Sequence, residues 1–513
     1  MSNENNDKKQ VSRRTFAKAA AIVAGAGVAT AAGLTIIPRH ILGGGGYRAA
    51  SDTPNIAGIG FGNQGGADLQ NIATMDVPGK AAPLNLISEP YAGVRKQRQG
   101  AGPGGGGSNA GGFSAASVVQ MGAANSGETF HYGNIYALCD IDTEYGSYIF
   151  EGYPNAKRYT DFRKLIDNEK SLDGVLIGTP DHTHAVIAAY AMAHGLHVFV
   201  EKPMAKTIYE TRKLAALAKK YKVITQMGNQ GHNTAGTWTT AEWIQSGKIG
   251  QVKEVHMWSD RPVWPQGYLT RPEGVPCPSH IDFDLFLGPA PEKPYSPEIH
   301  PFNWRGLQDY GTGALGDMGA HTIDCPIAAL ELGLPSTVQA TSTPVSKDYL
   351  PKSQRVTFTF PKTKWTGPEG LTLSWQDGGV KPPRPKELEE DRQLQNALYI
   401  GDKGMLMHST HGADPYLIPN DPDFKVDPWM ERPESVYVDW INAIKEGRKA
   451  KNDFEVASIL TEVLLLSNIA VMSQMNNLIL QYDSKNCKFT NLPEADALIH
   501  YEYRKGWEKY LEV

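Results

Sequence analysis

The sequence predicts an α/β protein with two domains: a doubly wound parallel sheet, followed by an α+β domain with a largely antiparallel open sheet. Strands and helices of ordinary length alternate over residues 55–226, which is the pattern of a parallel sheet covered on both faces. Later runs alternate apolar and polar residues, as in Gln251–Trp258, which indicates antiparallel strands with one covered face. We expect the first domain at 51–232, the second at 233–480, and a tail at 481–513 that packs back on both.

The composition is that of a soluble globular protein, with 41% apolar and 20% charged residues and a net charge of −5. The first 39 positions hold six Lys or Arg residues against two Asp or Glu, so the rest of the chain is acidic, which argues against nucleic acid as a partner. The four cysteines are scattered without the spacing of a metal site or of a disulfide framework, and we expect no metal.

An export signal is predicted in residues 1–50. Arg13 and Arg14 precede an alanine- and glycine-rich apolar run from Ala19 to Ile37, and this arrangement resembles a twin-arginine signal. The alternative is a transmembrane anchor, but alanine and glycine make the run only weakly hydrophobic. We therefore expect a periplasmic or extracytoplasmic protein that the twin-arginine machinery exports folded, and the cleavage site stays open.

A glycine-rich turn after the first strand predicts a dinucleotide site. The strand Asn55–Ile59 runs into a GxGxxG segment that opens a helix. The first glycine permits the tight turn, the second lets a pyrophosphate approach the backbone, and the third lets helix and strand pack closely. The helix N-terminus then offers N–H groups to the phosphates. The residues expected at the cofactor are Gly60, Phe61, Gly62, Asn63, Gln64 and Gly65.

The acidic residue that this fingerprint requires is displaced by an insertion. A glycine-rich, low-complexity segment at about 78–133 separates the fingerprint from the next strand, Asn134–Asp140. Asp140 is predicted to bind the ribose hydroxyls of the adenosine, which favours NAD over NADP because a carboxylate repels a 2′-phosphate. The alternative is that Asp140 only caps the following turn.

Polar residues gather at the carboxyl ends of the other predicted strands. The strand in Leu196–Pro203 ends in Glu201 and Lys202, and Pro203 forces a turn. Because ligands of parallel sheets bind at these strand ends, Lys202 is expected at the rim of the site. A solvent-exposed charged pair is the alternative. The further residues expected at the cofactor are Thr179, Pro180, His184, Glu201, Lys202 and Asn229.

The second domain is predicted to supply a carboxylate and an imidazole. Asp317 and His321 are four residues apart, so on a helix they share one face, although an ordinary ion pair has the same spacing. Long connections hold aromatic and guanidinium side chains that suit sugar faces as well as they suit cores or interfaces: Trp258, Arg261, Trp264, Trp304 and Arg305. Of these, Trp304 and Arg305 are the predicted substrate contacts.

Together these motifs resemble those of the Gfo/Idh/MocA oxidoreductase family. The matching elements are the glycine fingerprint, Asp140, Gly178–His184, Glu201–Pro203 and Gly316–His321, over about residues 54–480. The resemblance implies an N-terminal Rossmann domain that binds NAD. It also implies that His321 is the acid/base, that Asp317 orients the substrate or the histidine, and that Lys202 stabilises the reacting oxygen and can relay its proton. The long insertion departs from the family pattern near the adenosine pocket.

We therefore expect an exported NAD-dependent oxidoreductase that transfers a hydride between a secondary hydroxyl of a sugar, glycoside or cyclic polyol and a tightly bound nicotinamide. Free NAD is not expected outside the cytoplasm, so the cofactor has to be bound before export. The alternative is an NAD-dependent glycosidase or lyase that oxidises the sugar transiently, and a third hypothesis is a sugar-binding protein that keeps the cofactor as structure. A homo-oligomer is also expected. The substrate and the net direction of the reaction stay open.

Overall fold

The computed structural model describes residues 43–44, 47–49, 53–73, 132–473 and 475–513. The predicted export signal and nearly all of the insertion lie outside these residues. Contacts divide the chain into two units, Met1–Asp52 and Thr53–Val513. The described part of the first unit is a pair of antiparallel strands, β1 (Gly43–Gly44) and β2 (Tyr47–Ala49). Both predicted domains belong to the second unit.

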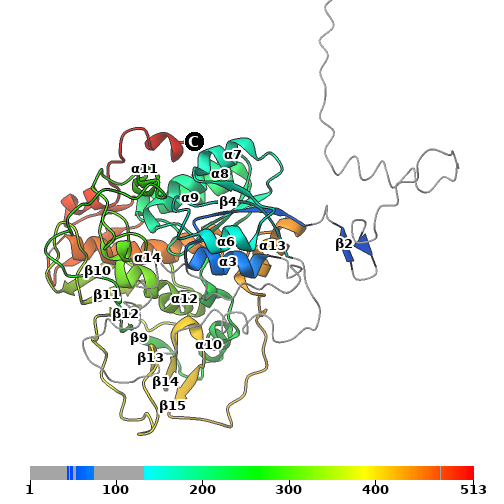
Figure 1. Cartoon of the computed structure of the whole chain (residues 1–513). Helices are drawn as coiled ribbons and strands as arrows, with labels where there is room; N and C mark the ends of the chain where they lie inside the picture. Colours follow the sequence, from blue (N-terminus) through cyan, green and yellow to red (C-terminus); the bar gives the residue numbers. More distant parts are fainter. Residues whose placement is uncertain (1–42, 45–46, 50–52, 74–131, 474) are drawn as a thin grey trace, which may run out of the picture. The chain divides into compact units, whose positions relative to one another are not determined.

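The first domain is built on a six-stranded parallel sheet in the order β5-β4-β3-β6-β7-β8 (Figure 1). Its strands are β3 (Asn55–Ile59), β4 (Asn134–Cys139), β5 (Lys157–Tyr159), β6 (Gly174–Ile177), β7 (His197–Glu201) and β8 (Thr225–Gly228). The central strands are apolar on both sides because helices cover both faces. Strand order reverses between β3 and β6, so the carboxyl ends of these two strands flank the crevice where such sheets bind ligands.

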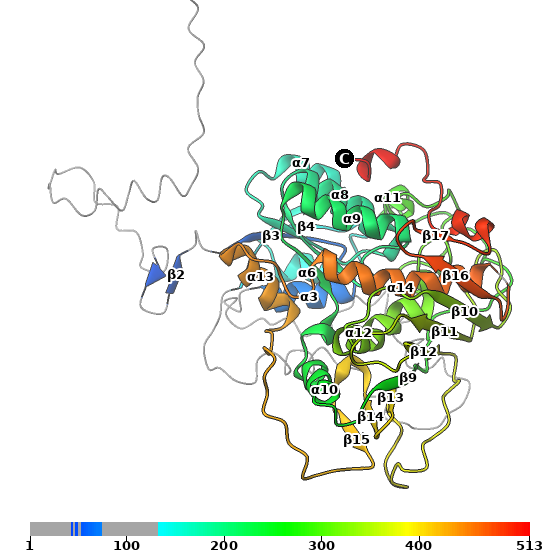
Figure 2. The same ribbon diagram turned by 180° about the vertical axis from the view of Figure 1, so that it is seen from behind.

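Helices on the two faces of this sheet form two separate cores. One face carries α7 (Phe162–Asn168), α8 (Asp181–Ala193) and α9 (Ile208–Tyr221). The other carries α3 (Gln64–Ile72), α6 (Ser147–Gly152) and α13 (Val436–Glu446), as the reverse view also shows (Figure 2). The helix α13 follows the second domain in sequence, yet its Trp440 is fully buried with α3 and the sheet. The chain therefore returns to the first domain near its end.

The second domain is a nine-stranded sheet in the order β15-β14-β13-β9-β12-β11-β10-β16-β17. All neighbours are antiparallel except β9 and β12, which run parallel. The strands are β9 (Val252–Trp258), β10 (Thr337–Ser342), β11 (Gln354–Phe360), β12 (Leu371–Gln376), β13 (Ala397–Gly401), β14 (Met405–His408), β15 (Tyr416–Ile418), β16 (Ile479–Asp483) and β17 (Lys488–Phe489). The two sheets confirm the predicted fold class.

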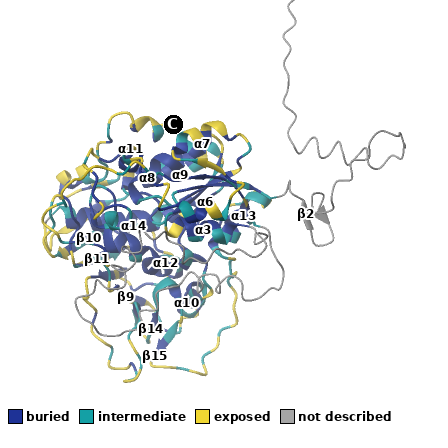
Figure 3. Cartoon of the chain, in the orientation of Figure 1, coloured by how far each residue is buried: buried dark blue, intermediate teal, exposed yellow. Residues whose placement is uncertain are grey.

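Three helices lie between the sheets: α10 (Ala235–Gln245), α12 (Ala320–Ala329) and α14 (Phe454–Met472) (Figure 1). The 19 residues of α14 are apolar and long enough to cross a membrane by length and composition, but 78% of its most apolar window is buried. Figure 3 shows it within the buried centre of the unit. It packs on α9 of the first domain and on β10 of the second, so it is a core helix that joins the domains.

Local capping sets some boundaries differently from the sequence prediction. The sequence predicts a helix over Pro428–Gly447, but α13 begins only at Val436, because the Ser435 hydroxyl accepts the N–H of Val438 and starts the helix there. The sequence also predicts a strand over Lys222–Gln226, but β8 begins at Thr225, because Lys222 ends α9 in a left-handed conformation with φ of 54°. Neither difference moves a predicted site residue off its strand end.

The C-terminal tail joins both domains by side-chain contacts. Tyr503 donates from its hydroxyl to Glu210 of α9. Arg504 donates to the backbone carbonyl of Asp284 in α11 (Phe283–Leu287) at 2.7 Å. Trp507 packs near Phe162 of α7, with ring centroids 6.3 Å apart.

Candidate active site

The glycine fingerprint forms a tight cradle at the carboxyl ends of β3 and β6. Gly60 has φ of +76°, and a Cβ there would lie 2.5 Å from Cγ2 of Thr179. A Cβ on Gly65 would lie 2.1 Å from the carbonyl oxygen of Gly60, and one on Gly178 would lie 2.6 Å from Cα of Gly65. These backbone approaches require glycine, as the fingerprint predicts. The helix α3 begins at Gln64, directly after this turn, so its positive N-terminal end adjoins the cradle.

Asp140 stands at the end of β4 beside this cradle. Its two carboxylate oxygens accept the backbone N–H groups of Phe61 at 2.9 Å and of Asp142 at 3.0 Å. Burial raises its pKa to about 6. Each oxygen keeps a second lone pair, which a ribose hydroxyl can use. The cradle, the helix end and this carboxylate together fit the adenosine and pyrophosphate of a dinucleotide.

Two residues that were predicted at the cofactor have their side chains in the core of the first domain. Phe61 is fully buried and meets Phe150 edge-on, with ring centroids 5.0 Å apart. The carboxyl group of Glu201 accepts the N–H of Lys202 at 3.2 Å and the amide of Gln230 at 3.2 Å. Adjacent residues of a strand point to opposite faces, so Lys202 reaches the site while Glu201 points inward.

A second buried carboxyl group lies beside Glu201. Asp68 of α3 is fully buried and accepts the Tyr437 hydroxyl at 2.7 Å and the Gln64 amide at 2.8 Å. Burial raises the pKa of Asp68 to about 6 and raises the pKa of Glu201 well above its usual value. Burial next to another carboxyl group favours the protonated form of each of the two. The amide of the predicted cofactor residue Gln64 is held by Asp68.

The ends of β6 and β7 are tied together by His184. Its two ring nitrogens lie 2.9 Å from the carbonyl oxygen of Pro203 and 2.8 Å from that of Thr179. The ring is buried, so it braces the turn that follows Lys202. Pro180 is the N-cap of α8, and the Thr179 hydroxyl accepts that of Thr183 at 2.8 Å.

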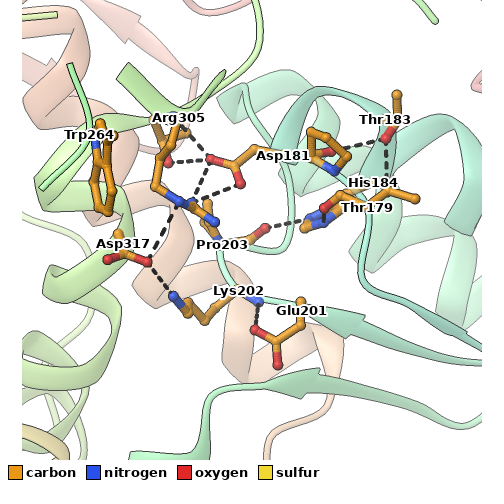
Figure 4. Close-up of polar contacts among 12 residues, drawn as sticks. Thr179, Asp181, Thr183, His184, Glu201, Lys202, Pro203, Trp264, Arg305 and Asp317 are labelled. Carbon is orange, nitrogen blue, oxygen red and sulfur yellow. Dashed lines mark hydrogen bonds and ion pairs between the residues drawn. The ribbon is translucent and has the colours of Figure 1, made fainter. Parts of the chain in front are cut away.

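The catalytic candidates Lys202 and Asp317 meet across the two domains (Figure 4). The Nζ of Lys202 lies 2.5 Å from Oδ1 of Asp317, and Nε of Arg305 lies 3.7 Å from the same oxygen. Arg305 also donates from Nη1 to Asp181 at 2.9 Å. Burial alone would raise the pKa of Asp317, but the charges of Lys202, Arg305 and Arg261 hold it well below its usual range. Asp317 is therefore a fixed negative charge that aims the ammonium group.

Asp317 belongs to a π-helical turn, Leu315–Gly319, that leads directly into α12. The sequence predicts a regular helix here, and the π turn is the local difference. Such turns are frequent at functional sites because they displace a side chain from the regular helical position. A Cβ on Gly316 would lie 2.0 Å from the Thr312 hydroxyl oxygen, so the turn also requires a glycine.

His321, at the start of α12, is held in one tautomer by Asn229. Its Nδ1 lies 3.0 Å from Oδ1 of Asn229, and the Nδ2 of that amide donates to the carbonyl of Ala320 at 3.0 Å. The hydrogen-bond network therefore assigns the proton to Nδ1 and leaves Nε2 free to accept one. Burial, with the neighbouring His411 and Lys202, lowers the pKa of His321 well below its usual value. Asn229, which the sequence predicts at the cofactor, thus fixes the base.

Two site residues were not predicted from the sequence: Asp181 and His411. Asp181 is fully buried, holds Arg305, and accepts the Thr312 hydroxyl at 2.6 Å. His411 comes from the turn between β14 and β15, where it has φ of +63°, and it stacks on His321 with ring centroids 4.0 Å apart. Burial and the charge of Lys202 lower the pKa of His411 to about 4. Two stacked imidazoles are therefore uncharged at neutral pH.

The predicted substrate contacts occupy one wall of this site. The Arg305 guanidinium lies 4.5 Å from the ring centroid of Trp304, and its Nη1 and Nε pair with Asp181 and Asp317. Arg305 therefore helps to position the carboxylate of Asp317. Within the described ranges, no group of three or more His, Cys, Asp or Glu side chains is arranged to hold a metal ion.

Two family models match the chain in the order of its domains. Residues 107–229 match the oxidoreductase family model with an NAD-binding Rossmann fold, and residues 251–364 match the α/β C-terminal domain of the same family, Gfo/Idh/MocA. The first match starts inside the insertion and leaves out the glycine fingerprint.

Curated relatives are similar over part of their length. An uncharacterised oxidoreductase of Schizosaccharomyces pombe is 26% identical over 43% of this chain and 52% of its own length. Levoglucosan dehydrogenase of Pseudarthrobacter phenanthrenivorans is 26% identical over 34% and 36%. Inositol 2-dehydrogenase of Salmonella typhimurium is 32% identical over 24% and 37%. The chain thus matches about half or less of the length of these relatives.

Solved structures share the fold. A levoglucosan dehydrogenase in complex with NADH and L-sorbose has a TM-score of 0.50 and 15% identity, over 83% of this chain and 98% of that one. The structure of GenD2 from gentamicin A biosynthesis, in complex with NAD, also has a TM-score of 0.50 and 15% identity, over 88% of this chain and all of that one. These structures show the two-domain fold, while residues 107–229 and 251–364 match the models of the Gfo/Idh/MocA oxidoreductase family, the first of which is its NAD-binding Rossmann domain.

Proposed function

We propose that this protein is a dehydrogenase that moves a hydride between a secondary hydroxyl of a sugar, glycoside or cyclic polyol and a bound NAD. The observation that carries the proposal is one cluster at the carboxyl ends of the first sheet. A neutral His321 with a free Nε2 lies in the same site as a Lys202–Asp317 ion pair of 2.5 Å. The names of two relatives, a levoglucosan and an inositol dehydrogenase, support ring hydroxyls as the substrate class.

Oxidation of a secondary alcohol removes the proton from the hydroxyl oxygen and a hydride from the carbon that bears this oxygen. Nε2 of His321 accepts the proton, because the pKa of this imidazole is low enough to keep it unprotonated. The ammonium of Lys202 has three N–H donors, of which Asp317 takes one, so the others can stabilise the developing alkoxide. When bound, NAD accepts the hydride. Reduction uses the same groups in reverse, with His321 returning the proton.

The first test is the near-ultraviolet absorbance of the protein, purified without added cofactor, on mixing with a panel of sugars, glycosides and polyols. A reduced-nicotinamide band with one of them supports the proposal, and this band should be lost in Lys202→Met and His321→Gln. Lys219→Met, which removes an exposed lysine from α9, serves as the control. Release of a free aglycone without net reduced nicotinamide would instead identify a glycosidase. The absence of any nicotinamide after acid release would contradict a tightly bound cofactor.

We also propose export of the folded protein through the twin-arginine route, on the strength of Arg13, Arg14 and the apolar run after them. Replacement of both arginines by lysine should retain the protein in the cytoplasmic fraction. Equal amounts of wild type and variant outside the cytoplasm would contradict this proposal.

A further inference from the structure

A second arginine adjoins the catalytic groups, on the connection that follows β9. The guanidinium of Arg261 lies 5.8 Å from the ring centroid of Trp264, and that of Arg305 lies 5.8 Å from the same ring. Trp264 is buried, and its indole N–H donates to Gln266 at 2.6 Å, which fixes the ring. Figure 4 shows this ring beside Arg305 and Asp317. Arg261 therefore lies near the same indole ring as Arg305 of the catalytic cluster.

The other charges of the cluster are matched in pairs. Lys202 is paired with Asp317 at 2.5 Å, and Arg305 with Asp181 at 2.9 Å. Among the described residues, Arg261 forms no ion pair with any carboxylate. Its backbone is held by the Ser259 hydroxyl, at 3.2 Å from its N–H, and its carbonyl accepts the N–H of Gly378 at 2.7 Å. The site therefore carries one fixed positive charge that none of the described side chains balances.

This charge acts on the catalytic residues, because Arg261 contributes to lowering the pKa of both Asp317 and His321. Because Arg261 and Arg305 lie near the same ring of Trp264, and Nε of Arg305 lies 3.7 Å from Asp317, a molecule bound at Asp317 can also contact the guanidinium of Arg261. Arg261 is partly exposed, so water solvates it before a substrate binds. A substrate that covers it removes this water, and an uncompensated guanidinium is costly to desolvate. A substrate that supplies an anion avoids that cost.

We infer that the substrate carries a carboxylate, as in a uronic acid, an aldonic acid or a glycoside of one, and that Arg261 binds this group. A carboxylate is the anion that the guanidinium fork recognises with two parallel hydrogen bonds. The inference rests on the proposed function for the reacting hydroxyl, and it adds to the substrate an acidic group that binds near Trp264. Arg261 is then the residue that selects acidic over neutral sugars.

Binding can be measured without turnover, by titration calorimetry of the full-length protein with its cofactor. The probes are D-glucuronate and D-galacturonate, their methyl esters as neutral analogues, and D-glucose and D-galactose. At least one acid should bind about 10-fold or more tightly than its ester and its neutral sugar, because a charged hydrogen-bond pair is worth about one to two powers of ten in affinity. Arg261→Gln should weaken binding of that acid by about 10- to 100-fold and leave neutral sugars unchanged, and Arg261→Lys should retain part of the preference.

Lys381→Gln is the matched control. It removes one positive charge from the neighbouring loop, but Lys381 is exposed and is paired with Asp260 at 3.2 Å. It should leave the binding of the acid unchanged. The inference is overturned if no acid binds, if neutral sugars bind as tightly as acids, or if Arg261→Gln and Lys381→Gln have equal effects.

The two proposals fail separately. If an acid binds through Arg261 but no sugar reduces the nicotinamide, the dehydrogenase proposal fails and the assignment of Arg261 stands. If a neutral sugar is oxidised while acids neither bind nor react, the assignment of Arg261 fails and the dehydrogenase proposal stands.

Discussion

Replacing Asn229 by Asp tests whether His321 is the base and which nitrogen it uses. The amide oxygen of Asn229 accepts the Nδ1–H of His321 at 3.0 Å, and both residues are buried. Aspartate has almost the same shape but places an anionic oxygen at that position. The protonated imidazole then gains a charged partner that the neutral imidazole lacks, so the pKa of His321 must rise.

The size of the effect follows from the hydrogen bond. A buried hydrogen bond to a charged group contributes about 1.5–3 kcal/mol, against about 1 kcal/mol for a neutral pair. The difference of about 0.5–2 kcal/mol corresponds to about 0.4–1.5 pKa units. Activity needs the unprotonated imidazole, so the acid limb of the pH profile moves upward by about this amount, while the rate on the alkaline plateau changes little. The pKa of the wild-type base starts well below its usual value.

The assay is the pH dependence of kcat/KM for nicotinamide reduction, in the wild type and in Asn229→Asp. Asn233→Asp is the control, because Asn233 lies on the same short 3-10 turn but donates to the carbonyl of Glu434. An acid limb that stays in place in Asn229→Asp, or that moves equally in both variants, would refute the assignment of His321 as a base fixed through Nδ1. A downward shift would refute the sign of the argument.

Three further predictions follow from the same cluster and its support. Lys202→Met should lower kcat by about 100-fold or more, since a preorganised donor to a developing oxyanion is worth about that much, and Lys219→Met should not; rates with saturating substrate decide between them. Gly65→Ala should destabilise the protein by about 1–3 kcal/mol and release the cofactor, because its Cβ would lie 2.1 Å from the Gly60 carbonyl, whereas Gly152→Ala meets no atom within 4 Å; denaturant titration and nicotinamide content are the measurements. Burial raises the pKa of Asp68 from 3.8 to about 6, so the folded wild type loses stability as pH rises through this range, where its unfolded chain is already deprotonated. Asp68→Asn has no such carboxyl group, so its unfolding free energy should increase relative to that of the wild type over the same range. That gain is at most about 3 kcal/mol, and a difference in unfolding free energy that does not change with pH would contradict it.

The fold could be predicted because its signal is local. In β11 (Gln354–Phe360), buried and more exposed residues alternate, and the same two-residue period can be read from the sequence as alternating apolar and polar residues. In β6, Gly174–Ile177, every residue is buried, and the sequence displays an uninterrupted apolar run. Strand ends could be predicted for the same reason, and Lys202 followed from its place at the end of β7.

The partners of the catalytic residues could not be predicted in this way. His411 stacks on His321 because its turn packs against residues far away in the sequence. A Cβ on Gly231 would lie 3.0 Å from Cα of His411, and one on Gly236 would lie 2.1 Å from the Gly412 carbonyl. These contacts depend on how two turns that are distant in the sequence pack together. The periodicity of apolar residues within each segment carries no information on such long-range packing.

The motif Glu201-Lys202 shows why neighbours in a motif need not share a role. A strand turns adjacent side chains to opposite faces, so a residue that reaches the site must have a neighbour that points inward. The carboxyl group of Glu201 accepts the backbone N–H of Lys202 at 3.2 Å and lies beside Asp68 of the glycine-fingerprint helix. The buried pair therefore joins the helix that carries the dinucleotide cradle to the strand that presents the lysine. A substitution in this pair can affect the reaction rate only by moving Lys202. Asp68→Asn should therefore lower the rate less than Lys202→Met, which removes the ammonium group itself.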